Sequence, residues 1–135
     1  MKILLSIMTL AAVFGFFGQA EGAEHTKDSL DKVKEGLSQK KAVLVDVREQ
    51  NEWDEGHLAG ATLVPLSQLN EKAKSKEFAA QLSKDLPKDK IVYCHCRAGK
   101  RALAAGDILK ELGYDVRPLK AGYQELIEAG FPQAK

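Results

Sequence analysis

The feature that most restricts the fold is a short apolar run, Ala42-Val43-Leu44-Val45-Asp46-Val47, which lacks the alternation of a half-exposed strand. A continuous run of this length, rich in β-branched residues, suits a strand buried on both faces of a parallel sheet. Similar short runs occur at 61–64, 90–95 and 114–119, and segments of helical composition separate them, at 27–39, 51–55, 66–82, 103–112 and 123–129. This alternation predicts an α/β fold with a mostly parallel central sheet of four to five strands, flanked by helices and joined by right-handed crossovers.

Capping and breaking residues mark the ends of these elements. Thr26 or Ser29 is a candidate N-cap for the first helix, and Ser75-Lys76 is a candidate break within 66–82. Gly113 is a candidate left-handed residue after the helix at 103–112. We expect residues 21–26 to be disordered and one folded domain to cover 27–133.

The first twenty residues differ in character from the rest. Lys2 is their only charge, residues 3–17 are almost wholly apolar, and small residues follow at Gly18 and Ala20. This pattern is typical of a secretory signal peptide over 1–20, with cleavage near Ala20 to Ala23. The apolar run is short for a membrane helix, which needs roughly 20 residues, although an uncleaved anchor is the alternative. We therefore expect a periplasmic or secreted protein without stable membrane insertion after cleavage.

The charge balance limits the classes of partner. Removing Lys2 from the 20 basic residues leaves 19, which equals the 19 acidic residues. A neutral balance argues against a nucleic-acid partner and against a broad basic surface for a membrane. Any attraction for anions must therefore be local to a site. The oligomeric state cannot be read from the sequence.

The two cysteines are too close for a conventional disulfide. Cys94 and Cys96 are two residues apart, which in a strand places them on one face at roughly 6.6 Å between Cα atoms. That separation is near the upper limit for a disulfide, and such a bridge would be strained and easily reduced. Cys94, inside an apolar strand, is as readily a buried structural residue as a functional one.

Cys96 begins a six-residue loop, Cys-Arg-Ala-Gly-Lys-Arg, between a strand and a helix. Gly99 can adopt a positive φ, so that backbone N–H groups turn inward around an anion. Arg97, Lys100 and Arg101 add positive charge, and the helix adds the positive end of its dipole. These features stabilise an anionic sulfur, and we predict that Cys96 is a thiolate nucleophile.

Polar residues at other strand ends are expected at the same edge of the sheet. Ligands of open parallel sheets bind outside the carboxyl ends of the strands, where Asp46-Val47-Arg48 and Pro65-Leu66 also lie. A buried carboxylate needs partners, so we expect Asp46 and Arg48 to support the site, with Arg48 paired to Asp46 or Glu49.

The loop resembles the active-site loop of rhodanese-type sulfurtransferases, in which Cys is followed by Arg, a variable residue, Gly, a variable residue and a basic residue or Thr. Aligning on Cys96 preserves this pattern, whereas aligning on Cys94 loses the Gly. Further similar segments are Val45-Asp46-Val47-Arg48-Glu49, Glu52-Trp53, Gly56-His57-Leu58-Ala59-Gly60-Ala61, Leu109 to Gly113, and Val116 to Tyr123 with Gly122. Two positions depart from the family, with Ala121 replacing a usual Gly and Leu126 a common Trp. The chain is thus similar to an exported, single-domain rhodanese-like protein with a three-layer fold.

The resemblance implies a mechanism. Cys96 would attack the outer sulfur of a donor such as thiosulfate, release sulfite, hold a persulfide, and pass that sulfur to cyanide or a thiol. Arg101 and Arg97, then Lys100, would bind the donor, with Ala98 and Gly99 completing the loop. The partners would be a small-molecule sulfur donor and acceptor, and no cofactor would be needed.

Other functions fit the residues less well. A cysteine phosphatase needs Arg six positions after the nucleophile, but position 102 is Ala and, counted from Cys94, position 100 is Lys. A metal site at Cys94-His95-Cys96 is disfavoured because a strand points His95 away from both sulfurs, and we expect no bound copper or zinc. A persulfide carrier or a CxC thiol-redox module stays open, with Cys94 as a possible resolving thiol.

Two aromatic residues upstream of the loop are expected to be structural. We interpret His57 as a hydrogen-bonded brace and Trp53 as a cap on the core.

Overall fold

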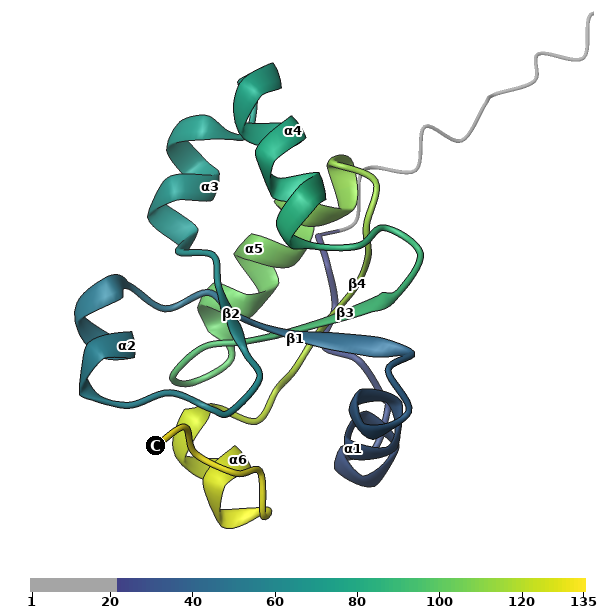
Figure 1. The fold of residues 1–135 in the computed structure, drawn as a ribbon, viewed down its shortest axis with the longest axis vertical. Helices are drawn as coiled ribbons and strands as arrows, with labels where there is room; N and C mark the ends of the chain where they lie inside the picture. The colour runs from purple at the N-terminus through teal and green to yellow at the C-terminus, as the bar shows by residue number, and fades with distance from the viewer. Residues whose placement is uncertain (1–21) are drawn as a thin grey trace, which may run out of the picture.

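The computed structural model describes residues 22–135, so the predicted signal segment 1–20 lies outside the described residues. The strands are β1 (Ala42–Asp46), β2 (Thr62–Leu63), β3 (Ile91–His95) and β4 (Asp115–Pro118). They form one four-stranded parallel sheet in the order β2-β1-β3-β4 (Figure 1). This confirms the predicted α/β class and parallel sheet.

Helices cover both faces of this sheet (Figure 1). They are α1 (Leu30–Ser38), α2 (Gln50–Glu55), α3 (Leu66–Lys72), α4 (Lys76–Asp85), α5 (Lys100–Glu111) and α6 (Tyr123–Glu128). One core cluster joins β1 and β3 to α3, α4 and α5, through residues such as Leu69, Leu82 and Leu109. A second cluster, on the opposite face, includes Val33 of α1 and Leu126 of α6.

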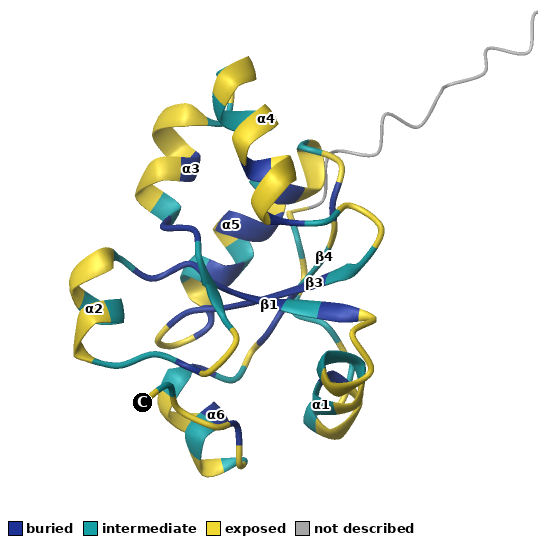
Figure 2. Cartoon of the chain, viewed as in Figure 1, coloured by how far each residue is buried: buried dark blue, intermediate teal, exposed yellow. Residues whose placement is uncertain are grey.

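The central strands are buried on both faces, as the unbroken apolar runs predict (Figure 2). In β3, Val92 and Cys94 belong to the first core cluster, whereas Tyr93 belongs to the second. Because successive side chains of a strand point to opposite faces, one short segment contributes to both cores.

Several predicted element ends are confirmed. The Ser29 side chain accepts from the Lys32 N–H at the start of α1, and Ser75 caps α4 and separates it from α3. Gly113 has φ +97°. The helix after the 96–101 loop begins earlier than predicted, at Lys100 rather than Leu103, because Gly99 serves as its N-cap with φ +95°.

The segment of residues 22–28, hereafter the N-terminal segment, is not the disordered tail expected for 21–26. The Thr26 N–H donates to the Pro118 carbonyl at 2.8 Å, which ties the segment to the end of β4. The Ala23 N–H donates to Asp107 of α5, and the His25 ring contacts the Gly99 carbonyl. These contacts are made by polar groups. The sequence predicts ordered elements mainly from the spacing of hydrophobic residues, so it does not predict that this segment is ordered.

Within residues 22–135, no helix is both long and apolar enough to cross a membrane.

Candidate active site

Cys96 lies immediately after β3, with only 1% of the residue exposed. Its Sγ accepts hydrogen bonds from the Gly99 N–H at 3.0 Å and the Ala102 N–H at 3.4 Å. The second donor belongs to the first turn of the twelve-residue helix α5, whose N-terminal dipole adds positive potential. The sulfur therefore occupies a cradle of backbone N–H groups, which stabilises an anion there.

Two glycines allow the backbone of the loop to pack this closely. A Cβ on Gly122 would lie 1.8 Å from the Arg97 carbonyl oxygen, and one on Gly99 would lie 2.8 Å from the Lys120 carbonyl oxygen. The next N–H after Gly122, that of Tyr123, donates to the Cys96 carbonyl at 2.9 Å. The turn before α6 thus packs closely against the backbone of the loop and stabilises it.

The cationic side chains of the loop differ in whether they are exposed or paired with an acidic residue. Arg97 and Lys100 are exposed, as is Ala98 between the cradle and solvent. Arg101 instead makes a two-pronged ion pair with Glu52 of α2, at 2.5 and 2.9 Å. Arg101, which the resemblance assigns to donor binding together with Arg97, is thus already paired with an acidic side chain.

The Glu52–Arg101 pair shifts the pKa of both side chains in the direction that favours their charged forms. The hydrogen bond from Arg101 lowers the pKa of Glu52 to about 2. The pKa of Arg101 is raised, first by Glu52 and to a lesser degree by the charge of Cys96. The Glu52-Trp53 pair was recognised in the sequence, but no role was assigned to Glu52, because 49 residues separate it from Arg101.

A cavity of about 440 Å³ opens beside the loop. Its lining combines basic, acidic and aromatic side chains around one end of α2 and the start of α6: Arg48, Glu52, Glu55, Gly56, Arg97, Tyr123 and Gln124. Arg97 is the loop residue that faces this space. This cavity provides room for a small molecule next to the loop.

Asp46 and Arg48 form a buried ion pair, with a shortest N–O distance of 2.7 Å. Arg48 also donates to the Gly56 carbonyl at 2.8 Å, and its guanidinium lies 4.1 Å from the centre of the Tyr123 ring. Arg48 therefore ties the end of β1 to α2 and α6. Of the two partners considered in the sequence, Asp46 is the one that it binds.

His95 lies between Asp46 and the loop. The sequence alone predicts no role for this residue. His95 is fully buried; its Nε2 lies 3.7 Å from Asp46 and has no hydrogen-bond partner among the described residues. Its Nδ1 lies 3.4 Å from the Cys96 carbonyl. Burial lowers the pKa of His95, so the ring is neutral near neutral pH.

Cys94 has the surroundings of a core residue. It is fully buried, its thiol contacts the Ala102 carbonyl at 3.4 Å, and burial raises its pKa to about 12. A resolving thiol needs thiolate character and access to its partner. The structure therefore gives no support to the resolving role considered for Cys94.

Trp53 and His57 stack on one another rather than acting separately. Their ring centres are 3.6 Å apart and their planes differ by 4°, and His57 Nδ1 lies 3.1 Å from the Trp53 carbonyl. The bracing role expected for His57 fits this contact. Trp53 is only partly buried and belongs to neither core cluster, so it is not the predicted core cap.

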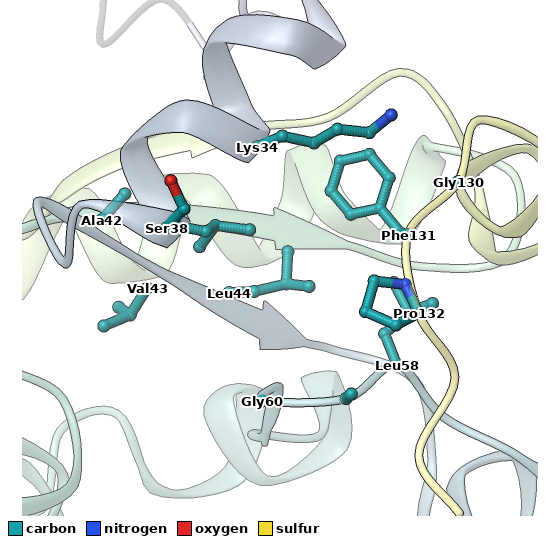
Figure 3. Close-up of a pocket in the computed structure, with 12 residues that line it drawn as sticks. Lys34, Ser38, Ala42, Val43, Leu44, Leu58, Gly60, Gly130, Phe131 and Pro132 are labelled. Atoms are coloured by element: carbon teal, nitrogen blue, oxygen red, sulfur yellow. The ribbon is translucent and has the colours of Figure 1, made fainter.

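An apolar hollow of about 420 Å³ lies apart from the 96–101 loop (Figure 3). It is lined by α1, by β1 and by the two segments that include Leu58 and Phe131, and it contains no residue of 96–101. β2 pairs only with Val45 and Asp46 of β1, which leaves the first part of that strand edge uncovered. Neither cysteine lines the hollow.

No group of three or more His, Cys, Asp or Glu side chains suited to a metal ion occurs within residues 22–135.

Comparisons with known proteins agree with this geometry. The Rhodanese-like domain family model matches residues 29–129. The human thiosulfate:glutathione sulfurtransferase is 32% identical over 105 residues, which cover 74% of this chain and 91% of that protein. A putative mitochondrial thiosulfate sulfurtransferase of Schizosaccharomyces pombe is 35% identical over 85 residues, covering 60% of this chain.

The match covers a smaller share of two other relatives, and a solved structure has a similar fold. The match spans 59% of the yeast protein and 61% of a Bacillus subtilis relative. The crystal structure of a rhodanese-related protein from Thermoplasma volcanium superimposes with a TM-score of 0.60 at 31% identity, covering 77% of this chain and 92% of that one.

Proposed function

Because the chain belongs to the rhodanese-like family, we propose that it is a sulfurtransferase that carries sulfur on Cys96. The donor is a small sulfur-containing molecule such as thiosulfate, and the acceptor is cyanide or a thiol. The observation that carries the proposal is the Cys96 sulfur held by the N–H groups of Gly99 and Ala102. Two relatives with thiosulfate sulfurtransferase in their names support it.

The first half-reaction loads the enzyme. The Cys96 thiolate attacks the outer sulfur of thiosulfate and forms a new S–S bond. The S–S bond of thiosulfate breaks, and sulfite leaves with its electron pair. The product is a Cys96 persulfide, whose outer sulfur extends beyond the position of the present Sγ.

The second half-reaction transfers the outer sulfur of the Cys96 persulfide to the acceptor. A cyanide or thiolate acceptor attacks the outer sulfur, and the persulfide S–S bond breaks with its electron pair returning to Cys96. The backbone N–H groups stabilise the anionic sulfur at the start and end of the cycle. Because these N–H groups already point at Sγ before either step, they need not reorient when negative charge returns to it.

The exposed cations suggest how an anionic donor is held. Arg97 faces the cavity beside the loop, and Lys100 is exposed at the first turn of α5. We assign Arg97 the main role in donor binding, with Lys100 second. Arg101, neutralised in part by Glu52, contributes to the potential around Cys96.

The test is a comparison of thiosulfate:cyanide activity in the wild type and Cys96→Ser, with intact-mass detection of a persulfide after thiosulfate alone. We expect turnover and one added sulfur in the wild type, and neither in Cys96→Ser. Full activity of Cys96→Ser would refute the assignment. A persulfide that forms without turnover would favour the alternative, a persulfide carrier.

We also propose that the protein is exported to the periplasm or secreted, on the basis of the basic start, apolar run and small residues of 1–20. The expected product of cleavage begins between Glu21 and Glu24. Mass spectrometry of the protein from the separated cell fractions tests this. Recovery only in the cytoplasm would contradict export, and an intact Met1 outside the cytoplasm would favour the uncleaved anchor.

A further inference from the structure

We propose that His25 is a positioning residue for the Cys96 cradle. Its imidazole holds the peptide after Gly99, so that the Gly99 N–H stays directed at the Cys96 sulfur. The proposal rests on the proposed function only in taking Cys96 as the reactive thiol.

The first observation is the contact between the ring and the loop. His25 Nε2 lies 2.8 Å from the Gly99 carbonyl oxygen. A carbonyl oxygen can only accept a hydrogen bond, so Nε2 must carry the hydrogen. His25 therefore acts as a donor to the residue that itself donates to Cys96.

The second observation is that Gly99 needs such a restraint. Its φ is +95°, and without a Cβ it has more accessible conformations than any other residue. It is nevertheless buried, with the Lys120 carbonyl 2.8 Å and the His25 ring 3.2 Å from the place where a Cβ would stand. Gly99 is thus confined between the chain before α6 and the N-terminal segment.

The third observation is that the N-terminal segment is anchored on both sides of His25. Ala23 is bonded through its N–H to Asp107, and Thr26 to the Pro118 carbonyl. Asp28 accepts from the Tyr93 hydroxyl at 2.7 Å and from Arg117 at 2.8 Å. His25 is therefore carried by a fixed stretch of chain, and its hydrogen bond transmits that rigidity to the loop.

The test measures the reactivity of Cys96 directly, through the pH profile of its alkylation by iodoacetamide. The variants are His25→Leu, His25→Gln and His25→Asn, with Lys27→Leu as a matched control at an exposed position of the same segment. Loss of the restraint weakens the Gly99 N–H bond to the thiolate, so the midpoint of the profile moves upward in His25→Leu by about half to one pH unit. Lys27→Leu keeps the wild-type midpoint.

The two amide variants separate positioning from a general effect on folding. The Gln amide nitrogen can reach as far as the imidazole Nε2, whereas that of Asn is one methylene short. We expect Gln to restore most of the wild-type profile and Asn to resemble Leu. This comparison decides the matter even if His25→Leu fails to fold.

Three results would overturn the proposal: a wild-type midpoint in His25→Leu, equal midpoints in the Gln and Asn variants, or an equal shift in Lys27→Leu. Alkylation needs no sulfur donor, so the outcome is independent of the proposed activity. For sulfur transfer itself, a positioning role predicts a loss in kcat with little change in the KM for thiosulfate.

Discussion

At the scale of single residues, the two cysteines have different surroundings although they are only two positions apart. Both are almost fully buried and both belong to the same core cluster. Cys94, within β3, meets a carbonyl and a dry interior, and its pKa is raised to about 12. Cys96, one step beyond the strand, meets two N–H groups instead. The end of the strand thus separates a thiol in an apolar interior from one that faces N–H donors, as the proposed role of Cys96 requires.

Cys94 is therefore expected to be dispensable for sulfur transfer. Cys94→Ala retains most of the thiosulfate:cyanide activity, at a stability cost of about 1 kcal/mol for the small cavity. Peptide mapping after iodoacetamide treatment near neutral pH finds the adduct on Cys96 in the native protein and on both cysteines after unfolding. A native adduct on Cys94, or loss of turnover in Cys94→Ala, would show that this thiol takes part in the reaction.

Gly122 is expected to tolerate no side chain. Gly122→Ala places a Cβ 1.8 Å from the Arg97 carbonyl, so the loop or the start of α6 must shift. We expect a loss of at least about 3 kcal/mol in the free energy of unfolding and a large loss of activity, measured by urea titration and steady-state kinetics.

Gly60→Ala is the matched control. Its added Cβ would meet nothing within 4 Å, although its φ of +77° is unfavourable for alanine. A cost of only about 1 kcal/mol is expected there, from backbone conformation alone. Equal losses in the two variants would mean that contact with Arg97 is not the cause.

At the scale of elements, the Glu52–Arg101 pair connects α2 to the first turn of α5. Glu52→Gln removes a negative charge beside the loop and leaves Arg101 unneutralised. We expect the KM for thiosulfate to fall about two- to fivefold at low ionic strength, with the gain reduced at high salt. The pair is partly exposed, so its loss costs only about 0.5 kcal/mol of stability.

Asp54→Asn provides the control for this change in charge. Asp54 lies on the same helix and is exposed, and it contacts Gln50 rather than the loop. Its KM is expected to stay near that of the wild type. A rise in KM for Glu52→Gln would instead show that Arg101 binds the donor only in the position that Glu52 gives it.

The sequence predicted the elements better than the contacts between them. The strand runs, the break at Ser75, and the positive φ values of Gly99 and Gly113 follow from local composition and are present in the structure. Cys96 and its loop were found because their residues are contiguous. Glu52 and His25 carry no predicted role because each meets the loop through a contact that only the folded chain creates. His95 directly precedes Cys96, but its approach to Asp46 joins two different strands and is likewise created by folding.

At the scale of the whole molecule, the parallel sheet brings distant segments to one edge. The register aligns Asp46 of β1 with His95 of β3, so the loop that follows β3 starts beside the Asp46–Arg48 pair. The segment after β4 supplies Gly122 beneath the loop, and the N-terminal segment supplies His25 beside it. The cradle is therefore supported by the turn before α6 and by the N-terminal segment.

The anchor of the N-terminal segment predicts how the whole molecule responds to acid. Hydrogen bonds from Arg117 and Tyr93 lower the pKa of Asp28 to about 2, from an ordinary value of 3.8. A carboxylate with a depressed folded-state pKa contributes stability that is present above its unfolded-state pKa and is lost as the pH falls toward the folded-state pKa. The contribution, roughly 2 kcal/mol, should therefore disappear between about pH 4 and pH 2.

Asp28→Asn tests this by removing the titrating group. The variant is expected to be less stable than the wild type at pH 7, and the difference in the free energy of unfolding should shrink as the pH approaches 2. Asp89→Asn, at an exposed position in the turn before β3, should keep the acid dependence of the wild type. If Asp28→Asn loses the same stability at pH 2 as at pH 7, the carboxylate does not titrate in this window.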